Sequence, residues 1–161
     1  MQTSAKRYIG GCLCGALRYE AEGEPLYAGH CYCCDCRKAS GSGFIPFMGF
    51  AGSAVRFSGE TRKFATRAAS GVDAVRNFCA VCGSLVFGGE VGRDDEFTIY
   101  VGSLDDPSLF RPTVAIFTRG RPDWASIRRG RLRCAGRGVG RLSPQDRRTR
   151  ARRCGRICVA S

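Results

Sequence analysis

The chain lacks any long hydrophobic run. The longest one, residues 44–55, is interrupted by Pro46 and two glycines, and it is shorter than the roughly 20 residues that a transmembrane helix needs. The first ten residues contain no apolar stretch of the kind found in a signal peptide. The sequence therefore predicts a soluble, cytoplasmic protein with no membrane partner.

A disulfide framework and a long amphipathic helix are also not expected. The chain has eleven cysteines, an odd number, and the expected compartment keeps thiols reduced. Short strand-like runs separated by glycine and serine predict an all-β fold instead. The predicted strands cover a stretch after the turn at residues 11–15, and residues 44–50, 54–57, 62–66, 72–78, 84–87, 97–101 and 113–117. The one short helix expected runs from Asp35 to Gly41, with a helical turn near Pro107.

Basic charge is concentrated at one end of the chain. The whole sequence has 26 lysines and arginines against 14 acidic residues, but residues 128–161 alone hold twelve arginines and one acidic residue. Residues 1–127 keep a net charge of +1, which argues against nucleic-acid binding by this part, and we expect them to form one domain. Residues 128–161 have no aromatic residue and no apolar periodicity, so they are predicted to be a disordered, low-complexity tail. Two interpretations of this tail stay open: a genuine basic segment able to bind nucleic acid, or a GC-rich gene translated out of frame.

Seven of the eleven cysteines fall at short, regular spacings. Cysteines two or three residues apart, in groups close to glycine, have the spacing of metal ligands rather than of disulfides. Zinc is the ion that this pattern favours. The three groups are Gly11-Cys12-Leu13-Cys14-Gly15, Cys31-Tyr32-Cys33-Cys34-Asp35-Cys36 and Cys79-Ala80-Val81-Cys82-Gly83.

These cysteines divide into two ligand sets, which predicts two zinc ions. Four thiolates close a tetrahedral structural site that joins the start of the chain to its middle. Three thiolates leave the fourth position open, as in a catalytic site. The four-ligand set is Cys12, Cys14, Cys79 and Cys82. The three-ligand set is Cys31, Cys33 and Cys36.

The residues around the second set suit a thiol substrate. Zinc with three thiolates has a formal charge of −1 and accepts an external thiolate well. Arg37 and Lys38 either bind an anionic thiol substrate or lie on a solvated helix face. His30, the only histidine, either completes the coordination, acts as a base or is a partly exposed loop residue. Cys34 is a spectator, a competing ligand or an oxidisable thiol.

The order of these motifs resembles the glutathione-dependent formaldehyde-activating enzyme family, which shares its domain with centromere protein V. The resemblance extends from about Gly10 to Ile127. The matching pieces are Gly11-Cys-x-Cys-Gly15, Cys31-x-Cys33-x-x-Cys36-Arg-Lys, Phe78-Cys-x-x-Cys-Gly-Ser, Gly102-Ser-Leu-Asp-Asp-Pro107, Arg111-Pro112 and Arg121-Pro-Asp-Trp124.

The resemblance implies an Mss4-like β-tent fold with two zinc ions. It implies a structural zinc at Cys12, Cys14, Cys79 and Cys82 and a catalytic zinc at Cys31, Cys33 and Cys36. The activity implied is that of a carbon–sulfur lyase, which condenses formaldehyde with glutathione to S-(hydroxymethyl)glutathione. Two other hypotheses remain: a non-enzymatic zinc module that binds nucleic acid or a protein partner, and a redox sensor that uses Cys33, Cys34 and Cys36.

Overall fold

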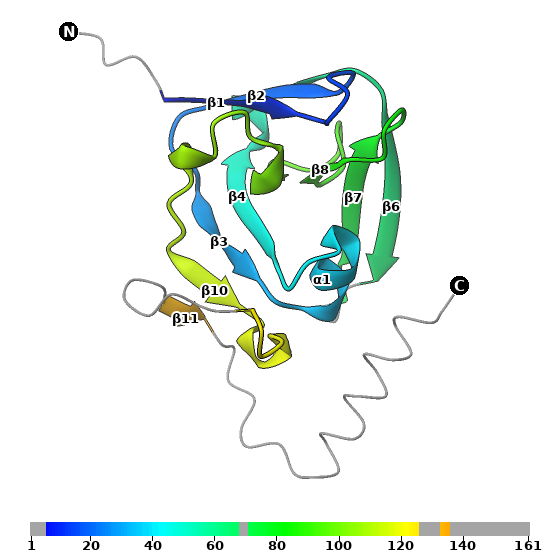
Figure 1. The fold of residues 1–161 in the computed structure, drawn as a ribbon. Coiled ribbons are helices and arrows are strands. Elements are labelled where there is room, and N and C mark those ends of the chain that lie inside the picture. Colours follow the sequence, from blue (N-terminus) through cyan, green and yellow to red (C-terminus); the bar gives the residue numbers. More distant parts are fainter. Residues whose placement is uncertain (1–5, 68–70, 126–132, 136–161) are drawn as a thin grey trace, which may run out of the picture. The chain divides into compact units, whose positions relative to one another are not determined.

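The computed structural model of the protein describes residues 6–67, 71–125 and 133–135 (Figure 1). The chain forms two compact units and passes between them more than once. The first unit lies within residues 1–29 and 46–113, and the second within residues 30–45 and 114–161. Strands in two sheets and one α-helix make up the described part, which confirms the predicted all-β class.

A three-stranded antiparallel sheet opens the first unit. It contains β1 (Arg7–Gly11), β2 (Arg18–Glu22) and β5 (Val55–Ser58), in the order β1-β2-β5. Side chains alternate between the two faces of a strand. Tyr8, Tyr19 and Ala21 are therefore buried, while their neighbours along the strands face outward or lie partly exposed.

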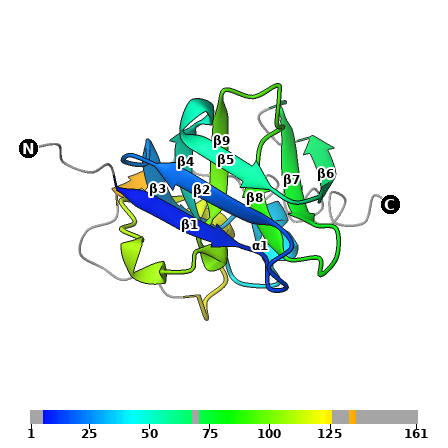
Figure 2. The same ribbon diagram turned by 90° about the horizontal axis from the view of Figure 1, so that it is seen from above.

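The first unit also contains five strands of the larger sheet, each antiparallel to its neighbours. Their order is β4-β9-β8-β7-β6. In Figure 2 the strands β2 and β5 cross in front of β4, β9 and β8, so the small sheet packs across the larger one. The bounds are β4 (Ile45–Ala51), β6 (Thr61–Arg67), β7 (Asp73–Cys79), β8 (Leu85–Gly88) and β9 (Glu96–Tyr100).

The main hydrophobic core lies between these two sheets. It includes Leu17, Phe50, Phe87 and Ile99, each with no more than 1% of its surface exposed. The Phe57 ring of β5 stacks on the Phe87 ring of β8 at 3.9 Å between centroids. Full burial of each such side chain stabilises the fold by about 1.5–3 kcal/mol, and this core holds in place the loops that carry four of the cysteines.

The second unit is built around a short helix. Helix α1 (Cys34–Ser40) follows β3 (Tyr27–Cys31). Each end of α1 lies within one residue of the predicted helix, Asp35 to Gly41. Gly41 adopts φ 62°, a left-handed conformation that glycine takes at little cost, and its N–H caps the helix. Strand β10 (Val114–Ile116) pairs in parallel with β11 (Arg133–Ala135). Tyr32, Ala115 and Ala125 form a small core with Phe44.

Short 3-10 helices connect several strands. The turn at Pro107–Leu109 confirms the helical turn expected near Pro107, and the Asp106 carboxylate accepts a hydrogen bond from the Ser108 N–H at 2.9 Å. The other three are Gly52–Ala54, Val101–Ser103 and Thr118–Gly120.

Three strands were not predicted. Two of them, β1 and β3, contain glycines that suggest turns, and the third, β11, lies inside the segment predicted to be disordered. Of residues 128–161 the structure describes only Arg133–Ala135, so the rest of the segment predicted to be disordered lies outside the described residues. Among the described residues, no helix is both long and apolar enough to cross a membrane.

Candidate metal centres

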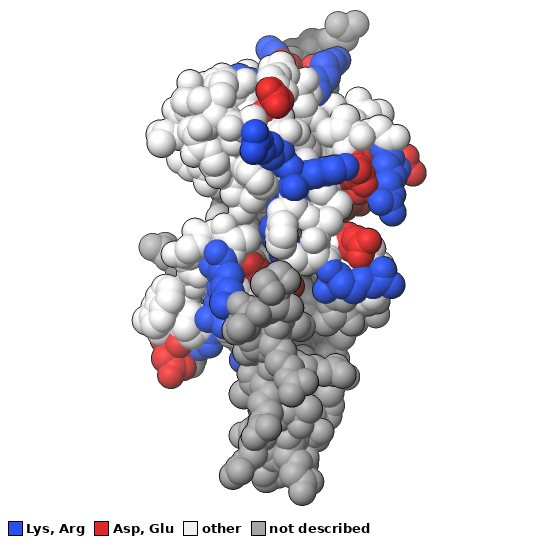
Figure 3. Space-filling model, turned by 90° about the vertical axis from the view of Figure 1, so that its right-hand side faces the viewer, with Lys and Arg blue, Asp and Glu red and all other residues white. Residues whose placement is uncertain are grey.

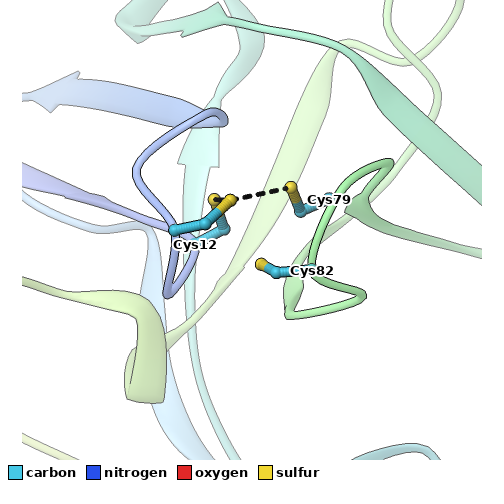
Figure 4. Close-up of side chains that lie close together, drawn as sticks. Cys12, Cys79 and Cys82 are labelled. Atoms are coloured by element: carbon cyan, nitrogen blue, oxygen red, sulfur yellow. Dashed lines mark hydrogen bonds between the residues drawn. The ribbon is translucent and has the colours of Figure 1, made fainter.

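Two short loops bring four cysteines together. Cys12 and Cys14 lie on the turn after β1, whereas Cys79 ends β7 and Cys82 lies on the turn before β8. All four Sγ atoms lie within 4.8 Å of one another, although Cys14 and Cys79 are 65 residues apart in sequence. Figure 4 shows the sulfurs of Cys12, Cys79 and Cys82 turned toward a common point. We call these four residues the four-cysteine cluster.

The first loop is folded by its own backbone. The Cys12 N–H donates to the Leu17 carbonyl at 2.9 Å, and the Leu17 N–H donates to the Cys12 sulfur at 3.2 Å. Gly15, at φ 80°, takes the left-handed conformation in the turn between them. The Cys12 and Cys14 sulfurs meet at 3.5 Å on this tight turn. The pair therefore lies on the turn that the sequence predicts at residues 11–15, and its two thiols point the same way.

The second loop has the same kind of support. The Cys79 N–H donates to the Ser84 carbonyl, and the Gly83 N–H donates to the Cys79 carbonyl, both at 3.0 Å. The Val81 N–H lies 3.4 Å from the Cys79 sulfur and donates to it. A backbone N–H therefore points at one sulfur in each loop, as in sites whose ligands are oriented by outer hydrogen bonds.

Ser84 links the two loops, a role that the sequence analysis did not predict. Its hydroxyl accepts a hydrogen bond from the Leu13 N–H at 3.2 Å and lies 3.2 Å from the Cys82 sulfur. The hydrogen bond from this hydroxyl, helped by backbone N–H groups, lowers the pKa of Cys82 to about 5. The Cys-Gly-Ser order in the second motif is the signal that could have identified Ser84.

The four-cysteine cluster has the dimensions of a metal site. Four sulfurs held tetrahedrally at about 2.3 Å from a zinc ion lie about 3.8 Å from one another. The Sγ–Sγ distance is 3.5 Å between Cys12 and Cys14 and 3.7 Å between Cys14 and Cys79. The cluster can therefore hold a metal ion, and its all-sulfur donor set is consistent with zinc.

The three-cysteine cluster is assembled within the second unit by a single local turn. Cys31 ends β3, Cys33 precedes α1, and Cys36 lies in the first turn of that helix. Their Sγ atoms lie within 4.8 Å of one another. Cys33 is the N-cap residue of α1, and its sulfur accepts a hydrogen bond from the Cys36 N–H at 3.3 Å. These residues, Cys31, Cys33 and Cys36, are the set predicted from spacing.

Three neighbouring thiols need a cation among them before all of them can ionise. Cys31 is buried, and the side chains of Cys33 and Cys36, followed by burial, raise its pKa well above the ordinary range of a thiol. A bound metal ion reverses this effect, because it stabilises each thiolate directly. The chemistry of these donors therefore also fits a metal ion.

Two of the other predicted residues lie on the same helix. Arg37 and Lys38 directly follow Cys36, so α1 places them within one turn of the cluster. Arg37 is half-buried and Lys38 is exposed. Cys34 is the first residue of α1 and is half-buried, but its sulfur does not belong to the group formed by the Sγ atoms of Cys31, Cys33 and Cys36.

Aromatic side chains and a glycine pack against the backbone and side chains next to Cys31 and Cys33. The Phe44 ring lies 4.8 Å from the His30 ring and 5.2 Å from the Tyr32 ring. Burial lowers the pKa of His30 below its usual value. Gly120 approaches so closely that a Cβ there would lie 2.8 Å from the Tyr32 carbonyl oxygen. Sequence reasoning missed Gly120, and its place directly before the Arg121-Pro motif was the available signal.

The chain was compared with known families, curated proteins and solved structures. Residues 7–120 match the family described as "Glutathione-dependent formaldehyde-activating enzyme", a range that includes all seven clustered cysteines. No curated protein is significantly similar to the chain. A crystal structure of a Rhodobacter sphaeroides protein is 24% identical to it, covering 60% of this chain and 87% of that one, with a TM-score of 0.43.

Proposed function

The chain belongs to the glutathione-dependent formaldehyde-activating enzyme family, and we propose that it is a zinc-dependent carbon–sulfur lyase. Its substrates would be a small thiol such as glutathione and a small aldehyde such as formaldehyde. In the forward reaction the thiolate sulfur bonds to the carbonyl carbon, the carbonyl π bond breaks, and the oxygen takes a proton. The reverse reaction releases the aldehyde, and neither direction needs an oxidant or a reductant.

The observation that supports this proposal is the difference in donor number between the two clusters. The described residues gather four thiols in one cluster and three in the other. A zinc ion with four protein ligands is closed to substrate, whereas one with three keeps a position open. We therefore assign structural zinc to the four-cysteine cluster and the reaction to Cys31, Cys33 and Cys36.

The roles of the chain's own residues follow from their placement. When bound, zinc supplies an open coordination position and the positive charge that keeps a substrate thiol ionised. Cys31, Cys33 and Cys36 hold that ion, with Cys33 and Cys36 oriented by the first turn of α1. Arg37 and Lys38 attract the carboxylates of a thiol such as glutathione and offset the negative charge of the three thiolates.

A cytoplasmic location suits this proposal, because the cysteines must stay reduced to bind metal. The alternative of a nucleic-acid-binding module depends on the arginines of residues 128–161. Only Arg133–Ala135 of that segment is described, and no feature of these three residues favours the alternative.

The test combines zinc counting with a rate measurement. Native mass spectrometry of the full chain should find two zinc ions, and a glutathione adduct when glutathione is added. Exchange NMR should show faster formation of the adduct between glutathione and formaldehyde than occurs without protein. Cys33→Ser should retain one zinc ion, lose the glutathione adduct and return the rate to the uncatalysed value.

Cys34→Ser is the matched control, since it makes the same chemical change one residue away. It should keep both zinc ions and the parent rate. If Cys33→Ser turns over as fast as the parent, or if the parent holds one zinc ion and ignores glutathione, the proposed function is wrong.

A further inference from the structure

Two aromatic side chains of the second unit are exposed. Phe117 has 56% of its surface exposed and Trp124 has 73%. By contrast, Tyr32 is buried and Phe44 packs against it in the small core. A single exposed aromatic residue is ordinary on a protein surface. What distinguishes Phe117 and Trp124, which we call the aromatic pair, is their position beside the three-cysteine cluster.

Backbone hydrogen bonds place Phe117 next to this cluster. The Tyr32 N–H donates to the carbonyl of Ile116, the residue before Phe117, at 3.0 Å. The Gly120 N–H donates to the Phe117 carbonyl at 2.9 Å. A Cβ on Gly120 would lie 2.8 Å from the Tyr32 carbonyl oxygen and 4.0 Å from the Cys33 Cα atom. The turn that begins at Phe117 therefore lies directly against the residues in the middle of the cluster.

The backbone of Phe117 is strained. Its φ of 55° and ψ of 35° lie in the left-handed region. Within residues 6–67, 71–125 and 133–135, it is the only non-glycine residue with a positive φ. A bulky side chain rarely adopts this conformation, and strained residues of this kind gather at binding and catalytic sites. The chain therefore keeps an exposed ring next to the cluster at a conformational cost.

A second turn fixes the position of Trp124. The Ala125 N–H donates to the Pro122 carbonyl at 3.0 Å, and the Arg121 guanidinium donates to the Ala125 carbonyl. The edge of the Trp124 ring lies so close to Gly43 that a Cβ there would be 2.9 Å from two of the ring carbons. Gly43 lies between α1 and β4. Trp124 therefore packs on the segment that leaves the helix of the three-cysteine cluster.

We propose that the aromatic pair binds the apolar substituent of the aldehyde, so that the preferred aldehyde has an aryl or long alkyl group. This inference rests on the proposed function, because it takes the reacting carbonyl group to the three-cysteine cluster. The reaction is unchanged: the thiolate sulfur bonds to the carbonyl carbon, the π bond breaks, and the oxygen takes a proton. Formaldehyde has no substituent to contact these rings and would be the poorer substrate.

The charges near the cluster explain why the aromatic pair is left to the aldehyde. Arg37 and Lys38 follow Cys36 on α1, and they suit the carboxylates of a thiol such as glutathione. An aromatic ring binds a second ring in an edge-to-face or offset-stacked arrangement. Each such contact changes a binding constant by about 2–12-fold, so two contacts together favour an aryl substituent by roughly 5–150-fold.

Phe64 supplies the matched control, because it is similarly exposed but belongs to the first unit. It has 61% of its surface exposed and lies at the centre of β6. Near it, Lys63 forms an ion pair with Glu90, and Arg67 forms one with Asp73 at 3.3 Å. Figure 3, which views the molecule from the side where β6 lies in Figure 1, shows basic and acidic side chains beside one another. The surroundings of Phe64 are therefore charged.

Two aldehydes that differ by one phenyl group, acetaldehyde and phenylacetaldehyde, test the proposal with glutathione and the zinc-loaded full chain. For the parent, kcat/KM should be about 5–150-fold higher for phenylacetaldehyde. Phe117→Ala and Trp124→Ala should each lower this preference about 2–12-fold, whereas Phe64→Ala should keep it. Zinc content and circular dichroism confirm that each variant is folded.

Binding can be measured separately from activity, since Trp124 is the only tryptophan in the chain. S-(2-phenylethyl)glutathione, which cannot react, should shift the tryptophan emission to shorter wavelength as the ring loses contact with water. S-ethylglutathione should bind more weakly by the same factor of about 5–150. Phe117→Ala should weaken binding of the phenylethyl compound about 2–12-fold.

The outcomes separate this inference from the proposed function. If formaldehyde and acetaldehyde react faster with the protein than without it, but phenylacetaldehyde gains no preference, the inference is wrong and the lyase stands. The same holds if the phenylethyl compound leaves the tryptophan emission unchanged. If no aldehyde reacts faster, the proposed function is wrong and the inference falls with it.

Discussion

The four-cysteine and three-cysteine clusters use the same ligand chemistry on very different spans of chain. The first joins residues up to 70 positions apart, through two loops that the core of the first unit holds in place. The second lies within six consecutive residues. By the chain-entropy estimate for a crosslink, closing a loop of about 65 residues stabilises the folded state by about 4 kcal/mol, against about 2 kcal/mol for a loop of five. A metal ion in the four-cysteine cluster would therefore stabilise the fold more than one in the three-cysteine cluster, which agrees with the roles proposed above for the two clusters.

The largest expected effect comes from removing one ligand from each cluster, which tests whether the two clusters stabilise the fold to different degrees. Cys79→Ser should cost on the order of 4 kcal/mol or more, because it weakens metal binding and opens the long loop. Since whole domains are stable by about 5–15 kcal/mol, this loss is a large share of the free energy of unfolding, and the unfolding temperature should fall far below that of the parent. Thermal unfolding followed by circular dichroism measures this change.

Cys36→Ser is the matched variant in the other cluster. It should lose one zinc ion and lower the unfolding temperature by about half as much as Cys79→Ser, because it opens only the short loop. If both variants lower the unfolding temperature equally, the division into a structural and a chemical cluster is wrong.

A smaller effect should come from the backbone contact beside the three-cysteine cluster. Gly120→Ala adds a methyl group 2.8 Å from the Tyr32 carbonyl oxygen, so the chain around Cys33 must shift, at a cost of about 1–3 kcal/mol. Competition with a chromogenic chelator should show weaker zinc binding at this cluster alone. Gly102→Ala is the control, since a Cβ there meets nothing within 4 Å; equal effects of the two changes would contradict the prediction.

The smallest effect concerns acid release of metal from the four-cysteine cluster. Because the Ser84 hydroxyl lowers the pKa of Cys82 to about 5, this thiol stays ionised as the pH falls toward that value. Ser84→Ala should raise that pKa, so metal release should begin at a higher pH, with affinity near pH 6 reduced about 10–100-fold. Zinc release during an acid titration measures the shift. Ser58→Ala, on β5, should behave as the parent, and an unchanged release midpoint in Ser84→Ala would refute the role of the hydroxyl.

Much of the fold and of both clusters could be predicted because the signals are local. The spacing of Cys31, Cys33 and Cys36 needs no knowledge of distant contacts, and neither does the helix that begins at Cys34. The four-cysteine cluster was harder, because it joins distant segments, yet its two motifs repeat the same pattern of a cysteine pair beside a glycine. Donor number then divided the seven thiols into sets of four and three, and the structure gathers the same two sets.

The missed features depend on contacts between segments far apart in the sequence. The strand β1 was not predicted, and Gly10 lies inside it, where the Ser103 carbonyl and the Tyr19 ring leave no space for a side chain. Gly49 lies in β4 under the Tyr27 ring for the same reason. Glycine marks both turns and close approaches, and only the tertiary structure distinguishes them. The role of Ser84 was hidden likewise, since Leu13, its backbone partner, is 71 residues away.

Because the two clusters span different lengths of chain, the ribosome completes their ligand sets at different times. Cys36 completes its cluster 46 residues before Cys82 completes the other. At about 5–20 residues per second, that interval lasts roughly 2–9 seconds. During this interval the nascent chain has all three thiols of the three-cysteine cluster, whereas the four-cysteine cluster still lacks Cys82. In a cell short of zinc, the three-cysteine cluster would therefore bind its ion before the four-cysteine cluster.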